Sequence, residues 1–355
     1  MKISRTTGRA ARTARLIAAA VAIGSVTLAA CGAQIRGEEE QNGSAQGNGR
    51  EGKQGPLRIA VVPKAVGFDF WEQVRAGAEC AATEHEDVTV QWDGVAQETD
   101  VTGQVDLLGD FVTSGVDGLV FAATDAQALS DVSDRALGEG IAVVNIDSGT
   151  DPQPEQVPVF ATDNEAAAEE AAGLLADALG GGQHDIALIS FQPGTATNDQ
   201  RMAGFRAGLE DHPNLREVAA QSSESDYNTG LRVTEDILTA NPGVDGIFAA
   251  NEPGALGAAE AVRGAGKQGE IEIIAWDAAP EELKAVRDGT ISALVVQNPF
   301  RMGYEGVQGA VKSLRTGEPP SSVDTGVTFV TKDNIDSERV QAVLEPSCEN
   351  PPTAD

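Results

Sequence analysis

From residue 57 onward, short apolar runs alternate with longer amphipathic stretches, and this alternation constrains the fold more than any other feature of the chain. The apolar runs are nearly continuous in Val, Ile, Leu and Ala, which is typical of strands buried on both faces. The stretches between them repeat their apolar residues at helical spacing. Strands that alternate with helices form parallel sheets through right-handed crossovers, so the sequence predicts an α/β fold.

The alternation runs through two blocks of similar size. In the first block the predicted strands are residues 57–62, 88–92, 118–122, 142–146 and 157–161, and the predicted helices are 70–83, 101–114 and 126–138. The second block begins with an Ala-rich helix at 165–179 and continues with strands at 185–190, 215–219, 246–250, 271–276 and 292–296 and helices at 200–209, 229–240, 255–264 and 281–288. A chain of 355 residues exceeds what one hydrophobic core usually serves, so two lobes are expected.

The end of the chain adds a helix at residues 303–314, an extended segment at 323–330 and a short final helix. This remainder is too small for a third domain. We expect it to complete both lobes by crossing back between them.

The N-terminus has the composition of an export signal. Residues 1–31 contain five basic side chains and no acid, and include an apolar stretch at 16–28. That stretch is too short to span a bilayer comfortably, which favours a secretory signal over a membrane span. The sequence LAAC at residues 28–31 matches the bacterial lipobox, which predicts cleavage before Cys31 and acylation of that cysteine. A plain secretory signal that ends near a cysteine is the alternative.

Residues 32–55 are rich in Gly, Gln, Glu, Asn and Ser and almost lack apolar side chains. Such a segment cannot bury enough apolar surface to fold, so it is expected to be a disordered tether. The sequence therefore predicts a folded domain held by its lipid at the outer face of the cytoplasmic membrane. Because no other membrane segment is evident, we expect a monomer.

Charge and cysteine content narrow the class of partner. The chain has 25 basic and 55 acidic residues and a net charge of -30, which argues against nucleic acid and against electrostatic binding to anionic lipid.

Cys80 and Cys348 can pair in an oxidising compartment, and two unpaired thiols are the alternative. The histidines are scattered and no Cys/His spacing indicates zinc, so neither a metal nor a cofactor is expected.

Polar side chains gather where the predicted strands end. Ligands bind at the carboxyl ends of strands in open parallel sheets, so these loops are the candidate site. They include Pro63-Lys64, Thr124-Asp125, Asp147-Ser148, residues 192–198, Asn251-Glu252, Asp277 and Gln297-Asn298. Aromatic residues make up only 4% of the chain, yet Phe68, Phe70 and Trp71 follow the first strand together.

This combination suits a sugar. Planar carboxylates and amides can bind adjacent hydroxyl groups, and aromatic rings can cover the C–H faces of the ring. Two such walls on separate lobes can close and exclude water. The alternative is that the polar residues only cap helices and form turns.

Several ordered sequence blocks resemble periplasmic sugar-binding proteins of the ribose, glucose and xylose type. The blocks are AVVPKAVGFDFWEQVR at 60–75, FAATDAQAL at 121–129, VVNIDSG at 143–149, ATDNEAAAEEAA at 161–172, GTATNDQRMAGF at 194–205, GIFAANEPGALGAAEAV at 246–262, IIAWDAAPE at 273–281 and VVQNPFRMGY at 295–304. The resemblance extends over residues 57–344, which is nearly all of the predicted folded part.

The resemblance implies two Rossmann-like lobes with parallel sheets, joined by a hinge of three strands that cross near Thr162, Gln297 and Thr325. The first lobe is then expected to comprise residues 56–161 and 298–325. The second is expected to comprise 162–297 and 326–346, followed by a tail at 347–355. The sugar contacts implied by the family pattern, or by the strand-end position, are Lys64, Phe70, Trp71, Asp125, Asp147, Ser148, Asp199, Asn251, Asp277 and Gln297.

The chain also departs from the ribose-binding pattern. Ser148 stands where ribose binders have arginine, and Asp199 stands near another family arginine, with Arg201 as the nearest replacement. The second-lobe aromatic residue of the family falls near Ser225, whereas Tyr227 is shifted. These departures put ribose itself in doubt and leave a pentose or hexose as the expected ligand.

The predicted function is capture of a monosaccharide for an ABC importer, with a membrane permease as partner. A receptor for a furanose-like signal such as autoinducer-2, or for a polyol, is the alternative, and Lys64 keeps it open. An enzyme is not expected, because no Ser/His/Asp set has supporting context and the three histidines do not lie at strand ends. Asp125 and Asp147 could in principle form a glycosidase pair, but carboxylates that bind hydroxyls look the same in sequence. A sugar-responsive repressor is excluded, because a signal and an acidic tether stand where a DNA-reading helix would be needed.

Overall fold

The computed structural model describes residues 52–349. The predicted signal at residues 1–31, with Cys31 as the acylated cysteine, and most of the predicted tether lie outside the described residues. Within the described part, no helix is long and apolar enough to cross a membrane.

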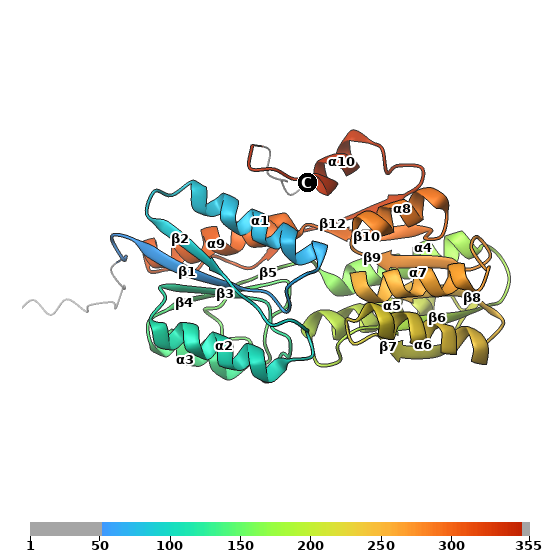
Figure 1. Cartoon of the computed structure of the whole chain (residues 1–355), viewed down its shortest axis with the longest axis horizontal. Helices are drawn as coiled ribbons and strands as arrows, with labels where there is room; N and C mark the ends of the chain where they lie inside the picture. Colours follow the sequence, from blue (N-terminus) through green and yellow to red (C-terminus); the bar gives the residue numbers. More distant parts are fainter. Residues whose placement is uncertain (1–51, 350–355) are drawn as a thin grey trace, which may run out of the picture. The chain divides into compact units, whose positions relative to one another are not determined.

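The first sheet has six strands in the order β11-β5-β4-β3-β1-β2, and all neighbouring strands are parallel. Its strands are β1 (Leu57–Val62), β2 (Val88–Trp92), β3 (Gly118–Phe121), β4 (Ala142–Ile146), β5 (Val159–Ala161) and β11 (Val323–Asp324). Its helices are α1 (Asp69–Thr83), α2 (Val101–Ser114), α3 (Ser130–Gly138) and α9 (Pro299–Thr316). Helices α1 and α9 cover one face, and α2 and α3 cover the other (Figure 1).

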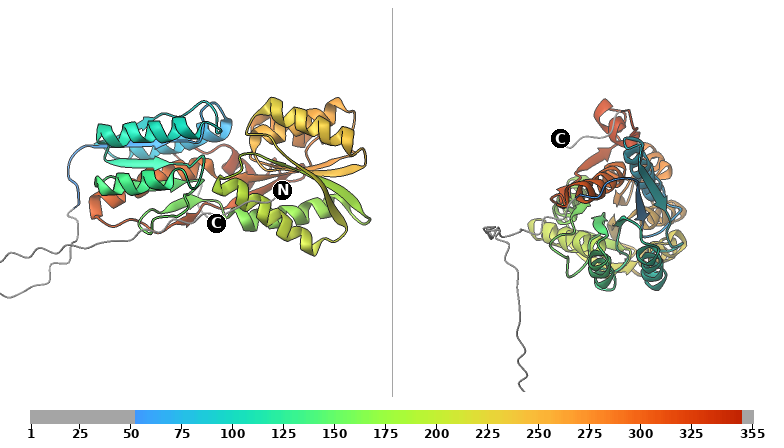
Figure 2. Two further views of the ribbon diagram at one scale, coloured as in Figure 1. Left: turned by 90° about the horizontal axis from the view of Figure 1, so that it is seen from below. Right: turned by 90° about the vertical axis from the view of Figure 1, so that its left-hand side faces the viewer.

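The second sheet also has six strands, in the order β12-β10-β9-β8-β6-β7. Its strands are β6 (His184–Ser190), β7 (Leu215–Ser222), β8 (Val244–Ala249), β9 (Glu272–Trp276), β10 (Ala293–Gln297) and β12 (Val327–Thr331). Its helices are α4 (Asn164–Leu179), α5 (Ala196–Asp211), α6 (Tyr227–Ala240), α7 (Glu252–Gly264), α8 (Pro280–Asp288) and α10 (Glu338–Leu344). Helices α4 and α5 pack on one face, and α6, α7 and α8 on the other, as the views in Figure 2 show.

The chain passes between the sheets at three places, namely after β5, after β10 and between β11 and β12. The hydroxyl of Thr162 donates to Oε1 of Gln297 over 3.1 Å, and the backbone N–H of Thr325 donates to the carbonyl of Ala161 over 2.9 Å. The crossing segments are thus hydrogen-bonded to one another. Two α/β lobes joined in this way confirm the predicted fold class.

Besides shifts of a few residues in the bounds of several elements, the structure differs from the sequence expectation in three ways. Strand β12 runs antiparallel to β10, so the second sheet is not wholly parallel. The segment predicted to be extended at 323–330 divides into β11 and β12, because Gly326 adopts a φ of 79° and turns the chain from one sheet to the other. Helix α3 begins at Ser130 rather than at 126, because the preceding residues form a turn around the carboxylate of Asp125.

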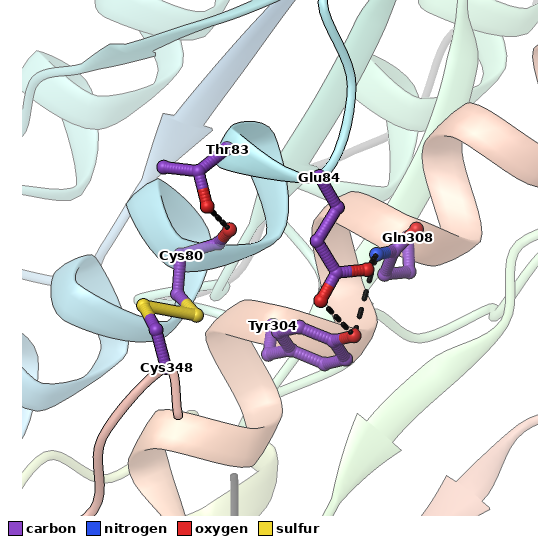
Figure 3. The surroundings of a disulfide bond; sticks show 6 residues. All are labelled: Cys80, Thr83, Glu84, Tyr304, Gln308 and Cys348. Atoms are coloured by element: carbon purple, nitrogen blue, oxygen red, sulfur yellow. Dashed lines mark hydrogen bonds between the residues drawn. A yellow bond between two sulfur atoms is a disulfide. The ribbon is translucent and has the colours of Figure 1, made fainter. Parts of the chain in front are cut away.

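A disulfide joins the C-terminal segment to the first lobe. Cys80 lies on α1 and Cys348 follows α10, and their Cα atoms are 5.5 Å apart (Figure 3). The segment that carries Cys348 is anchored in the core of the second lobe by Ile335 and Val340, which are 1% and 3% exposed. The disulfide therefore links the two lobes covalently outside the three crossings.

Candidate functional site

A small cavity lies between the lobes, where the carboxyl ends of both sheets meet. Its volume is about 30 Å³, which is room for two or three water molecules. Seven of the residues predicted from sequence line it: Lys64, Phe70, Trp71, Asp147, Asn251, Asp277 and Gln297. The other lining residues are Phe68, Glu98, Phe191, Arg201, Glu252 and Pro253.

On the first lobe, the wall of the cavity contains a buried ion pair. Lys64 follows β1 and Asp147 follows β4, and Nζ of the lysine lies 2.8 Å from Oδ2 of the aspartate, with both side chains 3% exposed. The lysine also donates to the hydroxyl of Thr197 on the second lobe over 2.7 Å. Asp147 has a φ of 57°, a left-handed conformation uncommon outside glycine, so the strand end holds this carboxylate in a particular orientation.

The first turn of α1 supplies an aromatic wall. Phe70 and Trp71 pack edge to face, with ring centroids 4.8 Å apart and an interplanar angle of 89°. Both side chains are buried. The indole Nε1–H of Trp71 donates to Oε1 of Glu98 over 3.3 Å, so the ring is fixed by a polar contact as well as by packing.

On the second lobe, Asp277 follows β9 and also has a positive φ, 79°. Gln297 donates from Nε2 to its Oδ1 over 2.7 Å, and the backbone N–H of Glu252 donates to its Oδ2 over 3.1 Å. Burial raises the pKa of Asp277, while the nearby Arg201 guanidinium and these hydrogen bonds act to lower it. The amide of Asn251 donates from Nδ2 to the hydroxyl of Ser225 over 3.0 Å.

Arg201 brings a second buried cation to the cavity. Its Nε donates to Oδ1 of Asn164 and its Nη1 to the carbonyl of Ala250, each over 2.8 Å. The guanidinium lies 3.7 Å from the ring centroid of Trp276. Burial lowers the pKa of Arg201, and the carboxylates of Asp277, Asp147 and Glu98 oppose that effect.

Of the charged lining residues, sequence reasoning missed Glu98, and it named Arg201 and Glu252 without assigning either a contact with the ligand. Arg201 lies on α5 one turn beyond the buried Asn198, on the same side of the helix, and the departure from the family arginine near Asp199 was the sequence signal for it. Glu98 lies in the loop after β2, a strand end that was not among the candidate loops. Its Oε2 accepts from the hydroxyl of Ser225 over 2.5 Å, so it joins the two lobes.

Three predicted contacts are not placed against the cavity. One carboxylate oxygen of Asp125 accepts from the backbone N–H groups of Gln127 and Ala128, and the side chain thus fixes a turn. Ser148 is fully buried but does not line the cavity. Asp199 is exposed on α5, where it accepts from Nδ2 of Asn198 over 2.9 Å.

The cavity combines two cations, four carboxylic side chains, two amides and four aromatic rings, contributed by both lobes. Such a set can satisfy hydroxyl groups as donors and as acceptors while rings cover apolar faces. Among residues 52–349, no group of three or more His, Cys, Asp or Glu side chains is arranged to hold a metal ion.

Known proteins share this sequence and architecture. A family model described as the periplasmic binding protein domain matches residues 59–319. A D-ribose/D-allose-binding protein from Pseudomonas aeruginosa is 33% identical over 76% of this chain and 86% of its own length. An ABC transporter solute-binding protein from Agrobacterium vitis, solved with bound D-fucose, is 34% identical with a TM-score of 0.78, over 81% of this chain and all of that one.

A further solved structure points the same way. A carbohydrate transporter solute-binding protein from Agrobacterium radiobacter, in complex with D-arabinose, has a TM-score of 0.78 and 31% identity, and covers 82% of this chain and all of its own. The matched segment includes most of both lobes and every residue that lines the cavity. The chain therefore belongs to the periplasmic binding protein domain family.

Proposed function

We propose that this protein is the solute-binding component of an ABC importer and that it binds a monosaccharide, a pentose or a hexose, in the cavity between its lobes. The observation that carries the proposal is the meeting of an aromatic wall from one lobe with hydroxyl-binding side chains from both lobes. Relatives with the same fold bind D-ribose, D-allose, D-fucose or D-arabinose, which supports a neutral sugar as the ligand class.

The charges of the cavity also favour a neutral ligand. Lys64 and Arg201 each lie near a carboxylate, Asp147 and Asp277 respectively, and Glu98 and Glu252 add two further acidic side chains to the lining. A ligand with its own charge would leave one of these groups without its partner, which is costly in a buried site. A polyhydroxylated ligand exchanges hydrogen bonds with them without adding charge.

In this proposal each wall has a distinct task. Phe70 and Trp71 cover a C–H face of the sugar, while Asp147 accepts from its hydroxyl groups on the side of the first lobe. Asn251, Asp277 and Gln297 bind hydroxyl groups on the side of the second lobe. The cavity has room for only two or three water molecules, so the lobes have to move apart to admit a sugar and then close around it less tightly than in this structure.

The importer role also implies an anchor and a partner. We propose that Cys31 is acylated and holds the protein at the outer face of the cytoplasmic membrane, where the closed form docks as a monomer on a permease.

We further propose that the sugar is bound and released unchanged. Incubation with aryl glycosides should therefore release no free phenol.

Thermal unfolding against a panel of sugars tests the proposal. The panel comprises D-ribose, D-allose, D-fucose, D-arabinose, the polyol xylitol and the furanose-like signal autoinducer-2. A ligand at about 100 times its dissociation constant should stabilise the protein by about 2.7 kcal/mol. An upward shift of several degrees with one pentose or hexose is the expected result. A shift with the polyol or the furanose signal alone would overturn the monosaccharide assignment, and no shift with any compound would overturn sugar binding.

A further inference from the structure

Glu252 is a residue of the second lobe whose side chain contacts the backbone of the first lobe. It is the first residue of α7, and it is 6% exposed. Its Oε1 accepts from the backbone N–H of Asp69 over 3.3 Å, and its Oε2 accepts from that of Phe70 over 3.1 Å. Both N–H groups belong to the first turn of α1.

The first turn of α1 lacks a cap from its own lobe. The first N–H groups of a helix have no partner within the helix and are usually satisfied by the side chain that precedes it. The N-cap residue of α1 is Phe68, which has no side-chain acceptor and makes no capping hydrogen bond. Glu252 supplies the missing acceptor from the other lobe, at the end of the helix where a carboxylate is favoured.

The same residue is joined to the predicted sugar contacts on both lobes. Its backbone N–H donates to Oδ2 of Asp277, whose other oxygen accepts from Gln297. The N–H of Phe70 that it caps is part of the turn that carries Phe70 and Trp71. Glu252 thus connects the acidic wall of the second lobe to the aromatic wall of the first.

We propose that Glu252 is a positioning residue that fastens the closed form, by capping α1 across the cleft and thereby setting the aromatic wall against the ligand. The contact forms only when the lobes come together, so its free energy contributes to closure and not to the folding of either lobe. The link to ligand affinity rests on the proposed sugar-binding function, whereas the capping contact itself does not.

The surroundings of Glu252 make this contact sensitive to pH. The titratable groups that face it are acids: Asp69 on α1, Asp277 after β9 and Glu282 on α8. Burial, reinforced by the Asp277 carboxylate, raises the pKa of Glu252 from 4.5 to about 7. When the lobes separate, Glu252 returns to water and its pKa falls toward the ordinary value. Closure therefore takes up a proton between these two pKa values and becomes more favourable as the pH falls.

Two substitutions separate the cap from the charge. Glu252→Ala removes both acceptor oxygens, whereas Glu252→Gln keeps one acceptor and cannot ionise. Glu260→Gln is the matched control, because Glu260 lies on the same helix and pairs with Arg263 rather than with α1. The affinity of each protein is measured by calorimetry at pH 8 and pH 6, with whichever of D-ribose, D-allose, D-fucose or D-arabinose stabilises the wild type.

The proposal predicts how the sugar affinity of each protein depends on pH. Wild type and Glu260→Gln bind roughly tenfold more tightly at pH 6 than at pH 8. Glu252→Gln loses this dependence and binds at pH 8 at least as tightly as wild type. Glu252→Ala binds about tenfold more weakly than Glu252→Gln at both pH values. Wild-type pH dependence in Glu252→Gln, or unchanged affinity in Glu252→Ala, would overturn the proposal.

Hydrogen exchange tests the cap directly in the closed form. With a saturating concentration of the sugar that stabilises the wild type, the amides of Asp69 and Phe70 should exchange several-fold faster in Glu252→Ala than in wild type or Glu260→Gln, while amides of the core strand β3 exchange as in wild type. Equal exchange at Asp69 and Phe70 in all proteins would overturn the cap. The thermal unfolding panel shows beforehand whether a sugar binds, so failure of the cap is distinguished from failure of the sugar-binding proposal.

Discussion

The two lobes place an aspartate at the same point of their sheets but surround it differently. Asp147 follows β4 and Asp277 follows β9, the third strand in each sheet order, and both have a positive φ. Asp147 forms an ion pair with the buried Lys64. Asp277 is held by the amide of Gln297 and the N–H of Glu252, and burial raises its pKa.

This difference shows that one topology can present the same carboxylate in two electrostatic settings. The first lobe neutralises its aspartate locally with a cation. The second lobe places Asp277 beside Glu252 and Glu282 as well as near the Arg201 guanidinium, and burial raises the pKa of both glutamates. We therefore expect the first wall to keep a fixed charge pattern and the second wall to respond to pH.

The largest expected effect comes from neutralising the two aspartates in turn. Asp147→Asn leaves Lys64 buried without its anionic partner, and should lower the free energy of unfolding by about 3–5 kcal/mol. Asp277→Asn should cost less, about 1–3 kcal/mol, because the weaker interaction with the buried Arg201 is partly offset by relief of repulsion from Glu252. Urea unfolding at pH 8 measures both values, and equal losses would contradict the proposed difference between the lobes.

Removing the disulfide tests how far the lobes depend on each other. Changing Cys80 and Cys348 together to serine should lower the free energy of unfolding by about 2–4 kcal/mol, because the unfolded chain is no longer constrained. The double variant also loses the covalent link between the lobes. Calorimetry of the wild type, with and without a reductant, is the control. If the variant and the oxidised wild type unfold at the same temperature, the link contributes nothing to stability.

The acidic group of the second lobe predicts how stability depends on pH. The pKa of Glu252 is about 7 in the closed, folded protein and near its ordinary 4.5 in the unfolded chain. The closed state therefore binds the proton more tightly, and its stability should fall as the pH rises from 5 to 8, by about 2 kcal/mol from this group. Thermal unfolding at both pH values, with the sugar present to keep the lobes closed, should show a smaller change in Glu252→Gln. The same change in both proteins would assign the effect to Asp277 or Glu282.

Much of the fold could be predicted because strands buried on both faces leave continuous apolar runs. Strands β1, β2 and β4 have the bounds that their apolar runs predict. The division at Gly326 could not be predicted in the same way, because β11 and β12 together look like one extended segment. Which sheet each half joins is decided by pairing with strands that are distant in the sequence.

The candidate site was predictable where a residue directly follows a strand, as Asp147 and Asp277 do. Glu252 was harder to identify, because an acid in the first turn of a helix is ordinary and its contact with α1 arises from the other lobe. Glu98 and Arg201 reach the cavity from a loop and from within a helix. Their roles depend on how the two lobes meet, which no local pattern contains.

The smallest expected effect comes from two carboxylates that the sequence suggested but the structure places elsewhere, one in each lobe. Asp125 fixes a turn before α3, and Asp199 is exposed on α5. Neither lines the cavity, so Asp125→Ala and Asp199→Ala should each change sugar affinity by less than about twofold, within the small range expected for residues that do not contact the ligand.

Asp125→Ala should still lower stability by about 1 kcal/mol, because two backbone N–H groups lose their acceptor. The affinities are measured by calorimetric titration and compared with that of Asp147→Ala, which should bind the sugar at least tenfold more weakly than wild type. A loss of similar size in Asp199→Ala would mean that the second lobe presents α5 to the ligand differently, and would move the wall of the second lobe from Asp277 toward that helix.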